Sequence, residues 1–200
     1  MINEMAALTR IVAVVAALAL LQAGCGGDAH KKRSTAGDER SDPPVQPPPG
    51  WRTITNPSAG FTIAAPRTWT ATSTPRRTVI RSDDRLVAMS ISADRTATGR
   101  ELSAEQYGRR TIRTLAHFAG IVGKRASRVP DSKYQSAIIT AIGTVKPSNL
   151  SQRISVAIFH IPGKVTYGAV VFRNAGVTPR FNDRTIARIL GTFRAQPPRY

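Results

Sequence analysis

The sequence predicts a mixed α+β domain with a mostly antiparallel central sheet flanked by helices. Short segments of alternating apolar and polar residues follow one another between residues 51 and 93, separated by turn-forming residues. Three later segments have the length and apolar content of buried strands: 137–145, 154–161 and 165–172. Two further segments carry apolar residues at helical spacing: 103–119 and 185–195.

The first strands are predicted from turn residues and alternation. Asn56-Pro57-Ser58-Ala59-Gly60 forms a turn cluster between a strand containing Ile54 and one containing Phe61 and Ile63. Two more strands are expected at Thr78–Ser82 and Leu86–Ala93. In the second, every other residue is apolar, which predicts a sheet with one face better covered than the other.

A helix is expected to begin at Ser103, because Ser103-Ala104-Glu105-Gln106 matches a capping box. Its apolar side would comprise Ile112, Leu115 and Ala119, and Gly120 would end it. Ala126–Val129 is expected to pair briefly as a strand.

The last strands and the terminal helix are expected to complete the core. The three long strands are apolar on both faces, which is typical of central strands, and Pro162-Gly163 would join the last two. The helix at 185–195 would have Asn182 as its cap. Its apolar stripe comprises Ile186, Ile189, Leu190 and Phe193.

The amino-terminal segment has the features of an export signal. The apolar run Ile11–Leu21 is shorter than the ~20 residues that a membrane-spanning helix needs, but it suits the apolar part of a signal peptide. The small residues before Cys25 resemble the lipobox of bacterial prolipoproteins, although Gln22 stands where that family usually has Leu. We therefore expect residues 1–24 to be a signal peptide and Cys25 to be lipidated. An uncleaved anchor, ordinary secretion and a start at Met5 remain open.

Residues 25–50 are expected to be a disordered, proline-rich tether, because they contain one hydrophobic residue larger than alanine, Val45. The folded domain would then span residues 51–196, followed by a tail at 197–200. The lone cysteine leaves this domain without a disulfide.

The opening of the domain resembles a known family. Asn56–Trp69, NPSAGFTIAAPRTW, contains a Gly-Phe-x-Ile strand, then a proline and then a tryptophan, and in this it is similar to the start of PsbP-like domains. Small envelope lipoproteins of this fold occur in actinobacteria. The resemblance covers roughly residues 51–196. It implies an α/β/α sandwich that serves as an accessory or binding module, and it implies no catalytic residues.

Positive charge is concentrated in the expected domain. The formal net charge is +17, and residues 51–200 hold 24 basic and 7 acidic residues, whereas the charges of the tether cancel. Such an excess attracts anions. Outside a membrane these would be anionic lipids or wall polymers rather than nucleic acid. The candidate anion-binding residues are Arg109, Arg110, Arg113, Lys124, Arg125 and Arg128. A basic surface without function, reflecting compositional bias, is the alternative.

The sequence offers little for catalysis or metal binding. His30, His117 and His160 have no ligand spacing, and a structural role is expected for His160 at the end of a core strand. Glu101 and Glu105 suit the first turn of a helix, where acids offset the helix dipole. We expect no catalytic residues, no cofactor and no metal.

The expected function is therefore that of a non-enzymatic envelope lipoprotein. It would be attached through Cys25 to the extracytoplasmic face of the cell membrane and bind a protein partner or an anionic envelope component. One alternative is a module for a small, lipid-like ligand, with a pocket between sheet and helix near Trp69 and Tyr167. The second is an enzyme of a type that no motif reveals. The sequence leaves open the oligomeric state and the choice between inner and outer membrane.

Overall fold

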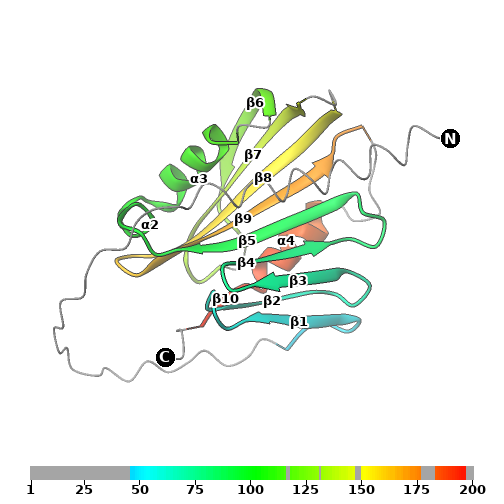
Figure 1. The fold of residues 1–200 in the computed structure, drawn as a ribbon, viewed down its shortest axis with the longest axis vertical. Helices are drawn as coiled ribbons and strands as arrows, with labels where there is room; N and C mark the ends of the chain where they lie inside the picture. Colours follow the sequence, from blue (N-terminus) through cyan, green and yellow to red (C-terminus); the bar gives the residue numbers. More distant parts are fainter. Residues whose placement is uncertain (1–45, 116–117, 131, 147–149, 177–182, 197–200) are drawn as a thin grey trace. The chain divides into compact units, whose positions relative to one another are not determined.

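The computed structural model describes residues 46–115, 118–130, 132–146, 150–176 and 183–196, which belong to one compact unit. The described residues form two antiparallel sheets with helices packed on them (Figure 1). The domain is thus a mixed α+β fold, as the sequence predicts. The expected signal peptide, Cys25, the tether up to residue 45 and the tail at 197–200 lie outside the described residues.

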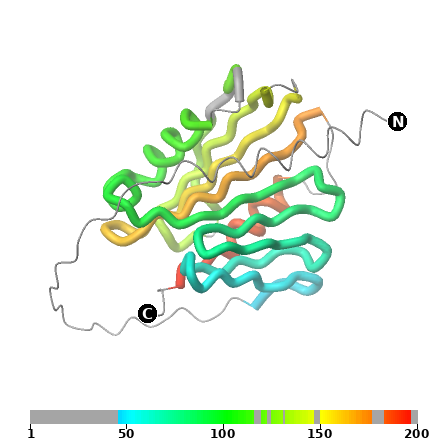
Figure 2. The backbone as a smooth tube through the Cα atoms, in the orientation of Figure 1, coloured from blue at the N-terminus to red at the C-terminus, as the bar shows by residue number. Residues whose placement is uncertain are grey.

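The larger sheet has seven strands in the order β3-β4-β5-β9-β8-β7-β6, and all of its neighbouring strands are antiparallel. Its strands are β3 (Thr70–Thr74), β4 (Arg77–Arg81), β5 (Val87–Asp94), β6 (Phe118–Ser127), β7 (Gln135–Val145), β8 (Leu150–Ile161) and β9 (Val165–Asn174). The path of the chain through these hairpins can be followed in Figure 2.

The smaller sheet has the order β1-β2-β10 and comprises β1 (Trp51–Asn56), β2 (Phe61–Pro66) and β10 (Arg194–Ala195). Gly60, between β1 and β2, has a φ of 79°. A Cβ at this position would lie 2.7 Å from the backbone oxygen of Gln196. Only glycine therefore lets the end of the chain close this sheet.

Helix α3 (Ala104–Arg113) covers one face of the larger sheet, next to the short α2 (Ala97–Glu101). The expected capping box is present, because Ser103 accepts from the Gln106 N–H and Gln106 accepts from the Ser103 N–H. Gly108 permits close approach, since a Cβ there would lie 2.8 Å from Ile139 and 3.3 Å from Ile158. This contact fixes α3 over β7 and β8.

Helix α4 (Asp183–Gly191) and the smaller sheet cover the opposite face of the larger sheet. The expected helical stripe is confirmed, because Ile186, Ile189 and Leu190 are buried in the main core. Phe193, which follows the helix, stacks on Phe159 with ring centroids 4.2 Å apart. Because side chains alternate along β8, Phe159 faces away from the neighbouring Ile158, which contacts the α3 side.

Both predicted helices are shorter than expected. The first ends at Arg113, where Thr114 caps it and donates its hydroxyl to the Thr111 carbonyl. The following residues, Phe118–Ser127, form strand β6 and pair with β7 instead of continuing the helix. The terminal helix likewise ends at Gly191, and Arg194–Ala195 pairs with β2. In both places, pairing with an available strand edge outweighs local helical spacing.

Two strand predictions and the boundary between tether and domain also need correction. The polar strand β3 was not expected, because it contains threonine, serine and alanine with no apolar alternation. Strand β7 is not apolar on both faces: its buried and partly exposed residues alternate, because it lies next to the edge strand β6. The ordered region also begins before Trp51, since the Trp51 N–H donates to the Pro48 carbonyl over 3.0 Å.

Candidate anion-binding cleft

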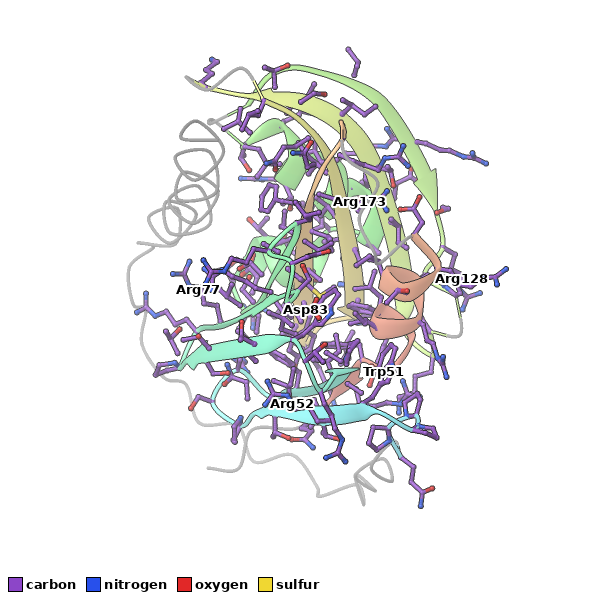
Figure 3. The ribbon with its side chains drawn as sticks, turned by 90° about the vertical axis from the view of Figure 1, so that its right-hand side faces the viewer. Trp51, Arg52, Arg77, Asp83, Arg128 and Arg173 are labelled. Atoms are coloured by element: carbon purple, nitrogen blue, oxygen red, sulfur yellow. The ribbon has the colours of Figure 1, made fainter. Side chains whose placement is uncertain are left out.

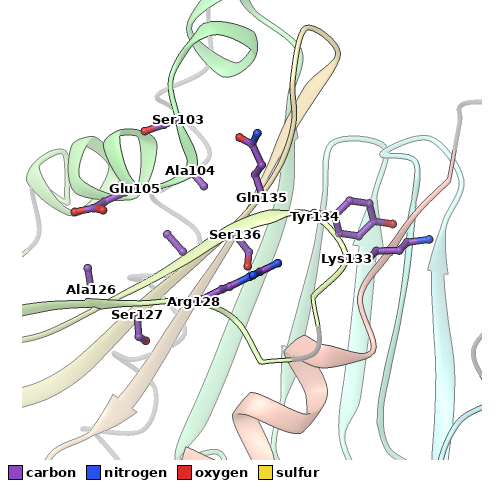
Figure 4. A pocket seen from close by; sticks show the side chains of 11 residues that line it. Ser103, Ala104, Glu105, Ala126, Ser127, Arg128, Lys133, Tyr134, Gln135 and Ser136 are labelled. Carbon is purple, nitrogen blue, oxygen red and sulfur yellow. The ribbon is translucent and has the colours of Figure 1, made fainter.

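A cleft of about 670 Å³ lies between the first turn of α3 and the ends of β6 and β7 that meet beside it (Figure 4). Three alanines contribute small apolar surfaces, whereas most of the other lining residues are polar. The lining residues are Ser103, Ala104, Glu105, Ala126, Ser127, Arg128, Lys133, Tyr134, Gln135, Ser136 and Ala137. The cleft is therefore suited to a polar ligand.

Arg128 and Ser136 are the cleft residues least committed to the fold. Arg128 is exposed, and its guanidinium donates to the Ser132 carbonyl over a long 3.4 Å. The hydroxyl oxygen of Ser136 is buried without a hydrogen-bond partner. In Figure 4 the Arg128 guanidinium and the Ser136 hydroxyl point toward the same part of the cleft, whereas Lys133 extends past Tyr134.

The charges around the cleft are mainly positive. Burial, and then the nearby charge of Arg194, lower the pKa of Lys133. Glu105 is the acidic side chain among the described lining residues, and Arg109 partly neutralises it through two hydrogen bonds of 2.7 and 2.9 Å. An anion in this cleft would therefore meet the exposed guanidinium of Arg128.

A row of polar side chains crosses the larger sheet toward the cleft. Asp94, Thr166, His160 and Gln135 are successive cross-strand neighbours on β5, β9, β8 and β7. His160 is 4% exposed, and its Nδ1 lies 2.8 Å from the Thr166 hydroxyl, which donates to the Gly99 carbonyl. Burial lowers the pKa of His160. This arrangement agrees with the structural role that the sequence predicts for His160.

Asp94 and Tyr107 continue this row under α3. The Tyr107 hydroxyl donates to Asp94 over 2.7 Å, and Asp94 also accepts from the Thr96 hydroxyl. Burial and the bond to Asp94 raise the pKa of Tyr107. Asp94 therefore joins β5 to α2 and α3, and its acceptor capacity is used within the fold.

The predicted cluster of six cations does not form one patch. Arg109 is paired with Glu105, while Arg110 and Arg113 are exposed on α3. Ile139 on β7 faces α3, because it lies against Gly108. The next residue, Thr140, therefore faces the other side of the sheet, and so does its partner in register, Arg125. Arg128 lines the cleft. The side chain of Lys124 lies outside the described residues.

The predicted pocket near Trp69 and Tyr167 is wrong. The two side chains are only 1% and 2% exposed and fill the main core. The Tyr167 hydroxyl donates to the Gly60 carbonyl over 2.8 Å, and burial raises its pKa to about 12. Large aromatic side chains that suggest a pocket in the sequence here join the two sheets.

No sequence motif marks Ser136, Gln135 or Lys133 as site residues. They become neighbours of Arg128 only because β6 and β7 form a hairpin. The segment Pro130-Asp131-Ser132-Lys133 has turn-forming residues between two strands, and this is the signal that could have located the cleft.

Within the part of the chain that the structure describes, no group of three His, Cys, Asp or Glu residues could hold a metal ion. No helix among these residues is long and apolar enough to cross a membrane.

No family model and no curated protein matches this sequence. Among solved structures, a crystal structure of a protein from Bacteroides thetaiotaomicron is similar to 72% of this chain, with a TM-score of 0.47 and 11% sequence identity. The chain spans about half of the length of that protein, since the match covers 48% of it.

Proposed function

We propose that this protein is a lipid-anchored envelope protein whose domain binds an anionic component of the envelope, or a protein partner, without catalysis. The domain would be a PsbP-like α/β/α sandwich, held near the extracytoplasmic face of the membrane by lipid on Cys25. The resemblance of Asn56–Trp69 to PsbP-like domains and the apolar run before Cys25 support this proposal.

The observation that carries the proposal is the excess of basic over acidic residues, together with the pairing of several of the described acidic residues with neighbouring groups. Asp183 binds Arg153 and Arg173 at the start of α4, and Glu105 binds Arg109. Asp94 and Asp84 accept hydrogen bonds from neighbouring backbone and side-chain groups. The 24 basic residues of the carboxy-terminal 150 residues outnumber the 7 acidic ones, so most of their charge has no acidic counterpart.

The exposed cations are spread over the domain. Arg76, Arg110, Arg113 and Arg128 are exposed, and Figure 3 shows Arg128 on the opposite side of the domain from Arg77, the half-buried neighbour of Arg76. A spread of this kind suits an extended polyanion better than a single small ion, because many weak contacts can act together. At physiological salt the Debye length is ~8 Å, so only anions close to the surface would be held.

A binding assay with the full chain in mild detergent tests the anionic ligand. Poly(glycerol phosphate) should bind, and a neutral dextran of similar length should not. Changing Arg109, Arg110 and Arg113 together to Gln should weaken binding more than the same change at Arg184, Arg188 and Arg194. The second set is a matched control, because it removes the same number of charges from a helix end where two arginines already have partners. Arg188 lies over the Trp51 ring, and Arg194 donates to the Gly191 and Phe193 carbonyls. Equal binding of both polymers would refute the anionic ligand and favour a protein partner.

Metabolic labelling with a fatty-acid analogue tests the membrane attachment separately. The wild-type chain should be labelled, and the Cys25→Ala variant should lose the label, because no other cysteine is present. A variant labelled as strongly as the wild type would contradict lipidation at Cys25.

A polar small ligand is a second candidate, and the cleft beside α3 favours it. Its volume of about 670 Å³ is within the usual range for ligand sites. The lipid-like ligand considered from the sequence has less support, because the small apolar lining of this cleft consists largely of alanines.

A further inference from the structure

The cleft beside α3 holds polar groups for which the fold has no use. A buried hydroxyl without a partner is unfavourable, so the unpaired oxygen of Ser136 calls for an explanation. Arg128 has a single long hydrogen bond to a backbone carbonyl and keeps most of its donors for other partners. The two groups line the same cavity. Together they suggest a ligand with several acceptor oxygens.

The chemistry of the lining narrows the class of ligand. An arginine fork matches the oxygens of a phosphate group, with two donors in one plane. Ser127 adds a hydroxyl on the side of the sheet that Ser136 faces, and Ser103 and Gln135 add a hydroxyl and an amide on the α3 side. Ala104, Ala126 and Ala137 provide too little apolar surface for an acyl chain. These features suit a phosphate attached to a hydroxylated carbon chain.

We propose that this cleft binds the phosphate group of a polyol phosphate, with the Arg128 guanidinium and the Ser136 hydroxyl, which lie beside each other in Figure 4, holding the phosphate oxygens. This inference rests on the proposed binding of an anionic envelope component and names the site on the domain. Rotation about χ1 of Ser136 turns its hydroxyl toward the ligand. Both an anionic phospholipid headgroup and a wall polymer contain this chemistry.

Arg125 provides a matched control for Arg128. It lies three residues earlier, is exposed, and is not among the described residues that line the cleft. Replacing either arginine by Gln removes the same charge from the same hairpin. General electrostatic attraction should therefore fall equally in both variants, and only the Arg128 variant should lose contacts in the cleft.

Isothermal titration calorimetry of sn-glycerol 1-phosphate into the full chain tests the site. We expect saturable binding at one site. Arg128→Gln should lower the affinity about tenfold or more, as is typical of a lost charged hydrogen bond, and Arg125→Gln less than about twofold. Ser136→Ala should lower the affinity about threefold without lowering the melting temperature, because the removed hydroxyl has no partner in the fold. Absence of saturable binding, or equal losses in the two arginine variants, would overturn the proposal.

Polymer binding separates this inference from the proposed function. Salt-sensitive binding of poly(glycerol phosphate) with no saturable binding of glycerol phosphate would refute the cleft and leave the basic surface as the binding site. If the chain binds neither poly(glycerol phosphate) nor glycerol phosphate, both the proposed anionic ligand and the cleft site are refuted. Short-chain phosphatidylglycerol and poly(glycerol phosphate) then distinguish the two sources. If one of these two ligands binds more tightly than the other and its binding depends on Arg128, that ligand represents the natural source of the phosphate. If neither ligand displaces glycerol phosphate, the assignment to an envelope ligand is overturned.

Discussion

Phe193 is predicted to be a critical side chain for the stability of the domain. It follows α4, is 1% exposed, and contacts aromatic rings from four other segments. Its ring centroid lies 4.2 Å from that of Phe159, 5.1 Å from Tyr167 and 5.8 Å from both Phe61 and Tyr134. This position joins the terminal segment, the smaller sheet and the larger sheet.

The expected cost of Phe193→Ala follows from burial and ring contacts. Replacing a buried phenylalanine by alanine costs about 3–5 kcal/mol, and an aromatic pair adds about 0.5–1.5 kcal/mol beyond its buried area. With four aromatic partners, we place Phe193→Ala at the upper end, about 4–5 kcal/mol. This is a large share of the about 5–15 kcal/mol that stabilises a typical domain. Phe193→Leu keeps most of the volume and should cost about 1.5 kcal/mol.

Urea unfolding of the full chain, followed by tryptophan fluorescence, measures these differences. Trp69 reports directly, because it belongs to the same buried cluster as Phe193. Val122→Ala is the control, since Val122 is 61% exposed and its truncation should change stability by less than about 0.5 kcal/mol. If Phe193→Ala proves too unstable to fold, the leucine variant supplies the measurement. A loss below about 2 kcal/mol for the alanine variant would refute the placement of Phe193 in the core.

Two further predictions concern charge and pH. The pKa of His160 is lowered by burial in the folded state, so the unfolded chain binds its proton more readily. Stability should therefore be retained above the ordinary histidine pKa of about 6.5 and fall as pH decreases below it. Unfolding curves of His160→Gln should show a smaller fall than the wild type, and parallel curves would contradict a buried, neutral His160. Asp183→Asn should weaken the contacts with Arg153 and Arg173 but lower stability by only about 0.5–1 kcal/mol, because Asp183 is 70% exposed. The difference should shrink in high salt, and a loss above about 2 kcal/mol would mean that the ion pairs are more buried than the structure shows.

Local sequence patterns correctly predict the elements that depend mainly on their own residues, such as turns, helix caps and amphipathic helices. The turn at Asn56–Gly60, the capping box at Ser103 and the apolar stripe of α4 are confirmed. The apolar spacing predicts a helix that continues to Ala119, but strand β6 begins at Phe118, because apolar residues at helical spacing also occur where a helix ends and a strand begins. Strand β3 could not be recognised, because an edge strand of polar residues depends on its partner for its structure.

The candidate site depended more strongly on the tertiary fold. Arg125 and Arg128 are close in sequence, yet Arg125 faces the side of the sheet opposite α3, and Arg128 lines the cleft against α3. A strand with two register shifts breaks simple alternation, so the sequence alone could not separate them. Trp69 and Tyr167, near which the sequence predicts a pocket, instead fill the space between the two sheets.

The dependence of poly(glycerol phosphate) affinity on ionic strength tests the central claim most directly. Because basic residues far outnumber acidic ones in the domain, the exposed cations should attract a polyanion through screened electrostatic forces. The dissociation constant of the full chain should therefore rise steadily as sodium chloride is raised from about 50 mM to about 500 mM, where the Debye length falls to a few ångströms. A dissociation constant that stays unchanged over this range, or no binding at the lowest salt, would contradict the proposed role of the basic surface.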